Sequence, residues 1–231
     1  FHDIAFANTV KPTHYLTGVE QKEHFEELGL ADKHLPFGLV LGTDGKKMKS
    51  RTGDSPDAEE ILDEIQGNLK ETPDPKKLAW NVIAWNFLGS ARLSNIKYDP
   101  VQWTNPDHPG MYISYTFARI SSAFGGLREG INIWHTEYLE KHSNYFNFTQ
   151  KDVELMGFAC YYDYYFKRVG DKMDPTEMAH FAKDLARQLN LAYKSEKING
   201  GREAFRQAVG FAAITLERAM LCLGMFPLLK V

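Results

Sequence analysis

Residues 35–51 read LPFGLVLGTDGKKMKSR, and this stretch says more about the fold and the function than the rest of the chain. An apolar run with strand character ends at Gly42, a turn follows at Asp44-Gly45, and four cations fall within residues 46–51. Lysines supply compact positive charges, and glycines let backbone N–H groups approach an anion. The pattern therefore fits a loop that grips a polyphosphate. It also fits a solvated basic hairpin tip.

The order of these pieces resembles the second nucleotide-binding motif of class I aminoacyl-tRNA synthetases, Lys-Met-Ser-Lys-Ser, and more narrowly that of arginyl-tRNA synthetases. The resemblance implies that Lys46, Lys47 and Lys49 neutralise the leaving pyrophosphate of ATP, and it leaves open which lysine contacts which phosphate. It also implies an ATP-binding role for four neighbours: Phe37, Gly38, Leu41 and Met48. Mg²⁺ is expected only as the counterion of ATP. The eight histidines and two cysteines lack metal-ligand spacing, so no protein-bound metal site is expected.

A second resemblance lies at residues 15–25, which read YLTGVEQKEHF. They resemble the strand-to-helix crossing of the same family, which ends in Gln-x-x-His-Phe and whose glutamine lines the amino-acid pocket. A Gln amide can accept a hydrogen bond from a guanidinium or donate one to a carboxylate. The resemblance implies that Gln21 contacts L-arginine. From the residues alone, an exposed Gln at the start of a helix is the alternative.

The sequence pattern changes near residue 75. Before it, we predict a strand at 14–17, a helix at 20–28, a second strand at 36–41 and a helix that starts at Ser55-Pro56. After Asp74-Pro75 no segment reads convincingly as a strand. We therefore predict a mainly α protein, with a partial Rossmann-like α/β segment at 1–74 and an all-α helical bundle at 75–231. By resemblance, these are the last part of the synthetase nucleotide-binding domain and the anticodon-binding domain.

Local signals mark further helices in the second part. Thr149 and Asp152 have the spacing of a capping box, and Asp174-Pro175 marks another helix start. Apolar residues then recur at helical spacing and predict two buried faces. The first face comprises Met178, Phe181, Leu185, Leu189 and Tyr193, and the second comprises Phe205, Val209, Ala212, Leu216, Met220 and Leu223.

Residues 110–120 read GMYISYTFARI and resemble the Tyr-x-Gln-Tyr-x-x-x-Arg helix of the family. Tyr112, Tyr115 and Arg119 match, and Ser114 stands in place of the glutamine. Such a face can stack unpaired bases and hold a phosphate, although both tyrosines fit an ordinary helical core equally well. Residues 184–193 resemble another family helix, and residues 181–206 carry six Lys or Arg against three Asp or Glu. Arg187 therefore joins the expected tRNA-binding residues.

Composition sets the class of protein. The chain has 231 residues, 43% apolar and 25% charged residues and a net charge of −3, which is ordinary for a globular protein. No stretch is apolar enough to span a membrane, and two cysteines do not make a disulfide framework. We expect a cytoplasmic monomer. Because residue 1 is Phe, we also expect the chain to be a piece of a longer polypeptide.

The resemblance implies part of an arginine–tRNA ligase, with ATP, L-arginine and arginine tRNAs as its partners. The other motif of class I synthetases, His-x-Gly-His, does not occur in these residues. The activity of this chain by itself is therefore in doubt, and the missing amino-terminal half of the synthetase is an expected partner. The alternative is a non-catalytic tRNA-binding or regulatory paralogue derived from a synthetase.

Overall fold

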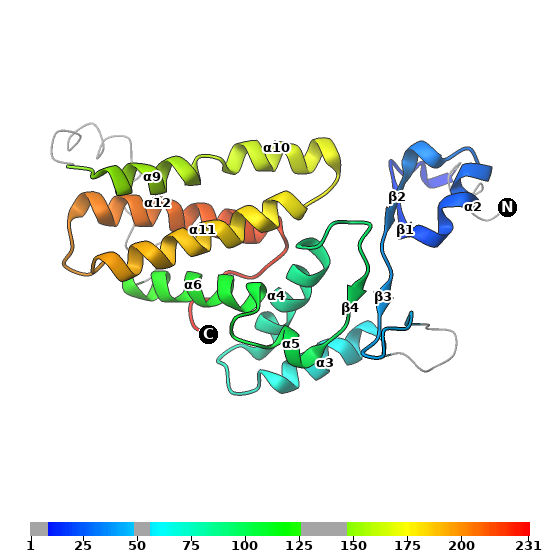
Figure 1. Cartoon of the computed structure of the whole chain (residues 1–231), viewed down its shortest axis with the longest axis horizontal. Coiled ribbons are helices and arrows are strands. Elements are labelled where there is room, and N and C mark those ends of the chain that lie inside the picture. Colours follow the sequence, from blue (N-terminus) through cyan, green and yellow to red (C-terminus); the bar gives the residue numbers. More distant parts are fainter. Residues whose placement is uncertain (1–8, 49–55, 126–146) are drawn as a thin grey trace. The chain divides into compact units, whose positions relative to one another are not determined.

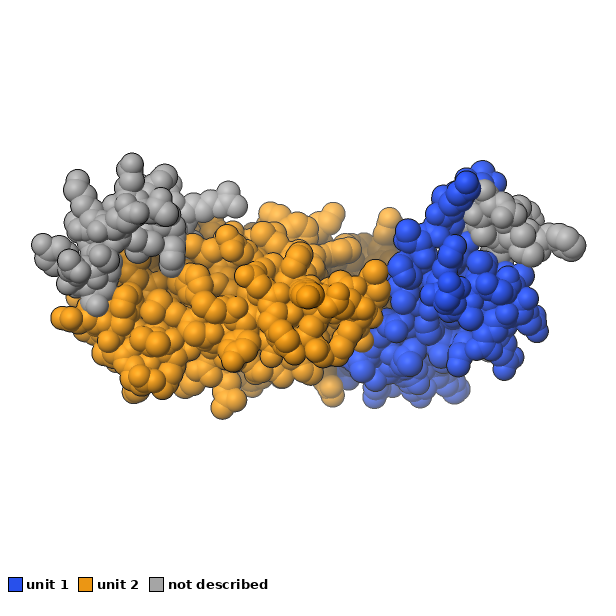
Figure 2. All heavy atoms as spheres, turned by 90° about the horizontal axis from the view of Figure 1, so that it is seen from above, with its two compact units in different colours: residues 1–57, 90–99 blue, residues 58–89, 100–231 orange. Residues whose placement is uncertain are grey.

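The computed structural model describes residues 9–48, 56–125 and 147–231 (Figure 1). The chain forms two compact units, which Figure 2 colours separately. Unit 1 comprises residues 1–57 and 90–99, and unit 2 comprises residues 58–89 and 100–231. Helices dominate, and the strands form small parallel sheets, so the predicted fold class is confirmed. The domain boundary expected at residue 75 stays a prediction.

Unit 1 is built from short elements. Its two sheets each contain two parallel strands: β1 pairs with β2, from Tyr15 opposite His34 to Gly18 opposite Phe37, and β3 pairs with β4. Phe25 is buried on α2, and its ring stacks on that of His34 at 4.5 Å. The elements are β1 (Tyr15–Gly18), a 3-10 helix (Val19–Gln21), α2 (Lys22–Glu27), a 3-10 helix (Ala31–Lys33), β2 (His34–Phe37), β3 (Val40–Leu41) and β4 (Ile96–Lys97).

The prediction of a single strand at 36–41 is wrong, because the strand is interrupted at Gly38 and two separate strands, β2 and β3, lie on either side of it. The Gly38 N–H donates to the carbonyl oxygen of Arg92 at 2.8 Å, and a Cβ atom at Gly38 would lie 2.1 Å from the carbonyl oxygen of Ser94. The segment 90–99 passes so close that only glycine fits here. Beyond the break the chain pairs with β4. The expectation of no strand after residue 75 is wrong too, because β4 (Ile96–Lys97) lies there. A strand of only two residues shows no alternating pattern in the sequence, so it could not be predicted.

Unit 2 is helical. Helix α11 packs against α6, α10 and α12, helix α12 also packs against α9, and α4 packs against α3 and α6 (Figure 1). The apolar core lies mainly among α6, α9, α11 and α12. The helices are α3 (Ala58–Asn68), α4 (Pro75–Leu88), α5 (Pro100–Trp103), α6 (Pro109–Ala123), α9 (Gln150–Ala159), α10 (Tyr162–Lys172), α11 (Thr176–Ser195) and α12 (Glu203–Cys222).

Several of the predicted helix starts are observed. Asp74 caps α4 by accepting from the Lys77 N–H at 3.2 Å, and the capping box of Thr149 and Asp152 is present at α9. Helix α11 begins one residue after Pro175. Helix α3 begins at Ala58, so the start predicted at Pro56 is wrong by two residues, and Ser55 lies outside the described residues.

The predicted apolar faces of α11 and α12 are buried, with one exception. Tyr193 is 38% exposed in the last turn of α11, and the guanidinium of Arg119 lies 5.5 Å from its ring centroid. An amphipathic aromatic ring tolerates such a half-exposed position, so periodicity alone overstated its burial. Both cysteines, Cys160 and Cys222, are free thiols.

The end of the chain is fixed to α4 by a buried amide. The Asn81 side chain is fully buried, accepts from the Phe226 N–H at 2.6 Å and donates to the Phe226 carbonyl at 2.8 Å. Next to it, the Trp80 indole N–H donates to the carbonyl of Gly224 at 2.9 Å. These bonds hold the terminal segment beside α4.

His108 makes the stability of unit 2 sensitive to pH. It is the N-cap of α6: its Nδ1 accepts from the Gly110 N–H at 3.3 Å, while Nε2 lies 3.4 Å from the Asn86 Oδ1 acceptor. This is a neutral ring, and burial lowers the pKa of His108 to about 4. Because an unfolded histidine titrates near 6.5, stability present above pH 6.5 is lost as the pH falls toward 4.

We therefore expect the free energy of unfolding to drop by about 1–2 kcal/mol between pH 7 and pH 5 through this residue, a range that allows for its partial exposure. His108→Asn keeps an N-cap acceptor but does not titrate, so its unfolding free energy should change less over this range. Urea denaturation at both pH values measures the difference. Equal pH dependence of the unfolding free energy in the two proteins would show that protonation of His108 does not cause the loss of stability.

Candidate functional site

The loop after β3 is a tight hairpin that carries two of the predicted lysines. The Gly42 N–H donates to the Lys46 carbonyl at 2.8 Å, and the Lys46 N–H donates to the Asp44 carboxylate at 2.9 Å. Gly45 has a φ of +77°, which favours glycine at this turn. The returning chain pairs Lys47 with Leu41 and Met48 with Val40. The predicted Asp-Gly turn therefore sits at the tip of an ordered hairpin.

The two described lysines have different surroundings. The Lys46 ammonium is highly exposed, 3.8 Å from the Asp44 carboxylate. The Lys47 ammonium bonds to the Glu20 carboxylate, and this bond, more than any other cause, lowers the pKa of Glu20. Both partners are partly exposed, and such ion pairs contribute about 0–1 kcal/mol, so a polyphosphate can displace Glu20. Lys49 lies outside the described residues.

The ion pair brings two predicted sites together. Glu20 precedes Gln21 in the 3-10 helix that follows β1, so the Glu20–Lys47 contact joins the lysine hairpin to the 3-10 helix that carries the predicted arginine-binding residue. Gln21 is exposed there. No sequence signal pointed to Glu20, because its contact with Lys47 spans 27 residues.

The segment around the predicted ATP-binding residues Phe37, Gly38 and Leu41 uses much of its backbone in internal hydrogen bonds. Besides the Gly38 bond described above, Leu39 donates to the Asn95 side chain at 3.0 Å and accepts from the Ile96 N–H at 2.9 Å. The Leu41 carbonyl accepts from the Tyr98 N–H at 2.8 Å. Phe37 is 37% exposed, and Leu41 and Met48 are half-buried. A nucleotide at this segment would therefore meet side chains more than backbone groups.

The second candidate site lies on α6 and α11 in unit 2. Tyr112 and Tyr115 are half-buried, with Tyr112 packed against the core, while Arg119 and Arg187 are exposed. Arg119 Nη1 donates to the Asn190 carboxamide oxygen at 3.2 Å, and the guanidinium lies over the Tyr193 ring. The structure thus joins Arg119 to the helix that carries Arg187, which is three residues before Asn190.

Ser114, which stands where the resemblance expects glutamine, points into the protein. It is fully buried, its hydroxyl donates to the Gly110 carbonyl at 2.8 Å, and it accepts from the Asn81 amide at 3.0 Å. The substitution therefore lies in the contact between α4 and α6. The short side chain lets Asn81 reach both Ser114 and the terminal segment.

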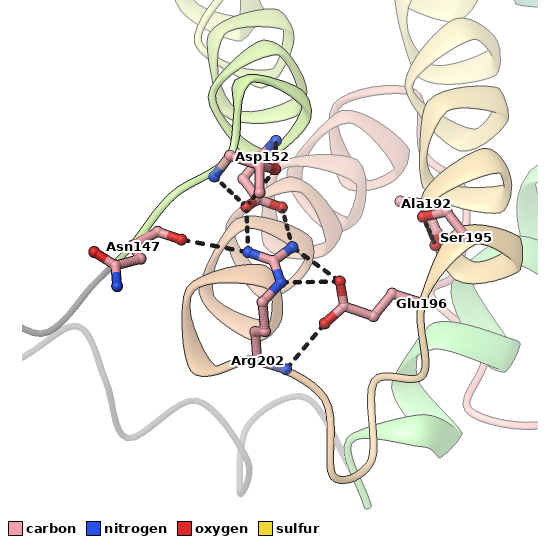
Figure 3. Close-up of polar contacts among 7 residues, drawn as sticks. Asn147, Asp152, Ala192, Ser195, Glu196 and Arg202 are labelled. Atoms are coloured by element: carbon pink, nitrogen blue, oxygen red, sulfur yellow. Dashed lines mark hydrogen bonds and ion pairs between the residues drawn. The ribbon is translucent and has the colours of Figure 1, made fainter.

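A third group surrounds Arg202, at a cavity of about 1020 Å³ lined by α9, α11 and α12 residues. Its guanidinium bridges Asp152 and Glu196, with Nη1 3.0 Å from Asp152 and Nη2 2.8 Å from Glu196 (Figure 3). Nη1 also donates to the Asn147 carbonyl at 3.3 Å. These charges satisfy one another, so we assign the cluster a structural role.

The described residues contain neither a metal-binding cluster nor a helix suited to cross a membrane. Within residues 9–48, 56–125 and 147–231, no group of three or more His, Cys, Asp or Glu side chains could hold a metal ion. In the same part of the chain, none of the helices combines the length and apolar character that crossing a membrane requires.

The sequence of the chain is similar to those of proteins named as arginine–tRNA ligases. The chain is 30% identical to "Arginine--tRNA ligase" of Acanthamoeba polyphaga mimivirus over 138 residues, which cover 47% of this chain and 23% of that protein. It is 24% identical to the enzyme of the same name from Latilactobacillus sakei over 237 residues, 91% of this chain and 40% of that protein. The chain thus spans at most two fifths of the length of these relatives. No protein-family model matches it.

Solved structures agree on the fold. An arginyl-tRNA synthetase from Plasmodium falciparum superposes with a TM-score of 0.69 at 18% identity, covering 99% of this chain and 43% of that one. An arginyl-tRNA synthetase from Thermus thermophilus gives the same TM-score and identity, covering 94% of this chain and 40% of that one.

Proposed function

We infer that this chain, a relative of arginine–tRNA ligases that spans about two fifths of their length, carries the ATP loop and the tRNA-binding helices of such an enzyme. The observation that carries the proposal is the sequence relationship, which extends over 91% of the chain. The reaction would join L-arginine to its tRNA with conversion of ATP to AMP and pyrophosphate. We propose that the protein is a monomer and acts in the cytoplasm.

The lysine hairpin supports the ATP-binding part of the proposal. Lys46 and Lys47 lie at the turn, and Lys47 contacts Glu20 of the 3-10 helix that also carries Gln21. Two ammonium groups at a hairpin tip can neutralise the charge that develops on a leaving pyrophosphate. Lys49 would add a third. Phe37, Gly38, Leu41 and Met48 would flank the nucleotide, whose Mg²⁺ would come with the ATP, and Gln21 would contact arginine.

The α6–α11 surface supports the tRNA-binding part. Arg119 and Arg187 are exposed, and Tyr112 and Tyr115 are accessible in part. Arginine forks bind phosphate, and tyrosine rings stack on unpaired bases. We propose that these four residues contact arginine tRNA.

Arg119→Ala is expected to weaken binding of an arginine tRNA transcript to the 231-residue chain about tenfold, because one charged contact to RNA is lost. The slope of log affinity against log salt should become shallower by roughly 0.7–0.9. Filter binding at several salt concentrations measures both quantities.

Arg218→Ala is the matched control, since it removes the same charge from an exposed position on α12. It should change affinity less than twofold. Equal losses in both variants would indicate only a nonspecific charge effect and would contradict the proposed site. Preference for arginine tRNAs without any contribution to arginine activation would favour the non-catalytic paralogue.

A further inference from the structure

Arg119 is held in place by neutral groups. Among the residues that the structure describes, its partners are the Asn190 carboxamide and the Tyr193 ring, whereas other arginines of unit 2 bond to carboxylates: Arg168 to Glu177 and Arg202 to Asp152. A carboxylate partner would cancel the charge of the guanidinium. An amide and an aromatic ring orient the guanidinium but leave its charge available to an anion.

The orientation of the Asn190 amide is itself determined by Thr116. The Thr116 hydroxyl donates its one proton to the Tyr112 carbonyl at 2.8 Å, so its oxygen can only accept a further bond. The Asn190 NH₂ group supplies that bond at 2.5 Å. The amide oxygen must then point the other way, toward Arg119 Nη1. Because Thr116 is 1% exposed and Asn190 is 9% exposed, water cannot readily replace these bonds.

We propose that Thr116, Asn190 and Tyr193 are positioning residues that hold the Arg119 guanidinium ready for a phosphate of bound tRNA, an inference that rests on the function proposed above. The hydrogen bond and the stacked ring restrict a side chain that otherwise loses much conformational freedom on binding. The remaining N–H groups of the exposed guanidinium can bond to phosphate oxygens. Affinity then depends on Thr116, a residue too deeply buried to touch RNA.

Thr116→Val tests this dependence, because valine keeps the shape and removes the hydroxyl. Without the Thr116 hydroxyl, no hydrogen bond fixes the Asn190 NH₂ group, and the amide oxygen is no longer forced to point toward Arg119. We expect affinity for an arginine tRNA transcript to fall about fivefold in Thr116→Val and less than twofold in Thr116→Ser, which restores the hydroxyl. Thr215→Val is the matched control: Thr215 is buried on α12 and bonds the carbonyl four residues earlier at 3.0 Å. It should change affinity less than twofold.

A double-mutant cycle separates positioning from general damage. In the Arg119→Ala background, Thr116→Val should cost less than a further twofold, because the side chain that it positions is gone. Equal losses with and without Arg119, or unchanged affinity in Thr116→Val, would overturn the inference while leaving the proposed function in place. Unchanged affinity in Arg119→Ala, or no binding of arginine tRNA by the native chain, would overturn both.

Tyr193 gives a second route if Thr116→Val lowers the melting temperature strongly. Tyr193 is partly exposed, so its replacement disturbs the core less. Tyr193→Phe keeps the ring under the guanidinium and should bind within twofold of the native chain. Tyr193→Leu removes the ring and should bind about threefold more weakly. Equal affinity of these two variants would count against the inference.

Discussion

Lys47→Ala is expected to lower arginine-dependent ATP–pyrophosphate exchange about 100-fold, in a fusion of this chain to the amino-terminal part of a related arginine–tRNA ligase. Removing one preorganised group that stabilises transition-state charge costs about 10²–10³-fold in rate. We expect the larger effect at Lys47 than at Lys46, because the Lys47 side chain is 41% exposed, whereas the Lys46 side chain is 86% exposed and less restricted. The fusion supplies His-x-Gly-His, which the 231 residues lack.

Lys22→Ala is the control for this experiment. Lys22 also carries a charge on unit 1 and also pairs with a carboxylate, that of Glu26 at 3.7 Å, but it lies on α2 and its ion pair does not involve the hairpin. It should change the exchange rate less than twofold. The 231-residue chain without the fusion should give no exchange above background, because half of the charge-stabilising groups are absent. Strong exchange by that chain alone, or equal rates for Lys47→Ala and Lys22→Ala, would contradict the proposed division of the active site.

Features that depend on neighbouring residues could be predicted from the sequence. The capping box at Thr149 and Asp152 is an example, because the two residues are three positions apart and satisfy each other's backbone groups. The N-cap at Asp74 is another. The apolar faces of α11 and α12 followed from their helical spacing in the same way.

Features that depend on residues far apart in the chain could not be predicted from the sequence. The break at Gly38 is imposed by a segment more than 50 residues later, and the Glu20–Lys47 pair joins two loops. Asn190 is a polar residue that directly follows Leu189, which belongs to a predicted buried face. This signal was not used in the prediction. A buried amide in such a place needs partners, and Thr116 and Arg119 are those partners.

Asp152→Ala is expected to destabilise the chain by about 2–4 kcal/mol. Asp152 is 3% exposed, and its carboxylate accepts from the Thr149 N–H at 2.7 Å, from the Thr149 hydroxyl at 2.8 Å and from Arg202. The substitution removes the capping box of α9 and, at the same time, the buried carboxylate that pairs with the partly exposed Arg202. Thermal unfolding should show a melting temperature lower by roughly 10 °C.

Asp74→Ala is the matched comparison, because Asp74 also caps a helix and also pairs with a lysine, but at the surface. Its cost should be only about 0.5–1.5 kcal/mol, so the difference between the variants reports the burial of the Asp152 carboxylate and its pair with Arg202. The pH dependence gives a second check. Burial alone would raise the pKa of Asp152, but the bonds from Arg202 and Thr149 outweigh it, and the net pKa lies below 3.8. The stabilisation is therefore present above about pH 4 and lost as the pH falls through the lowered pKa. Asp152→Ala should flatten the acid limb of the stability curve. An unchanged limb would show that the bonds from Arg202 and Thr149 do not lower this pKa in the folded protein.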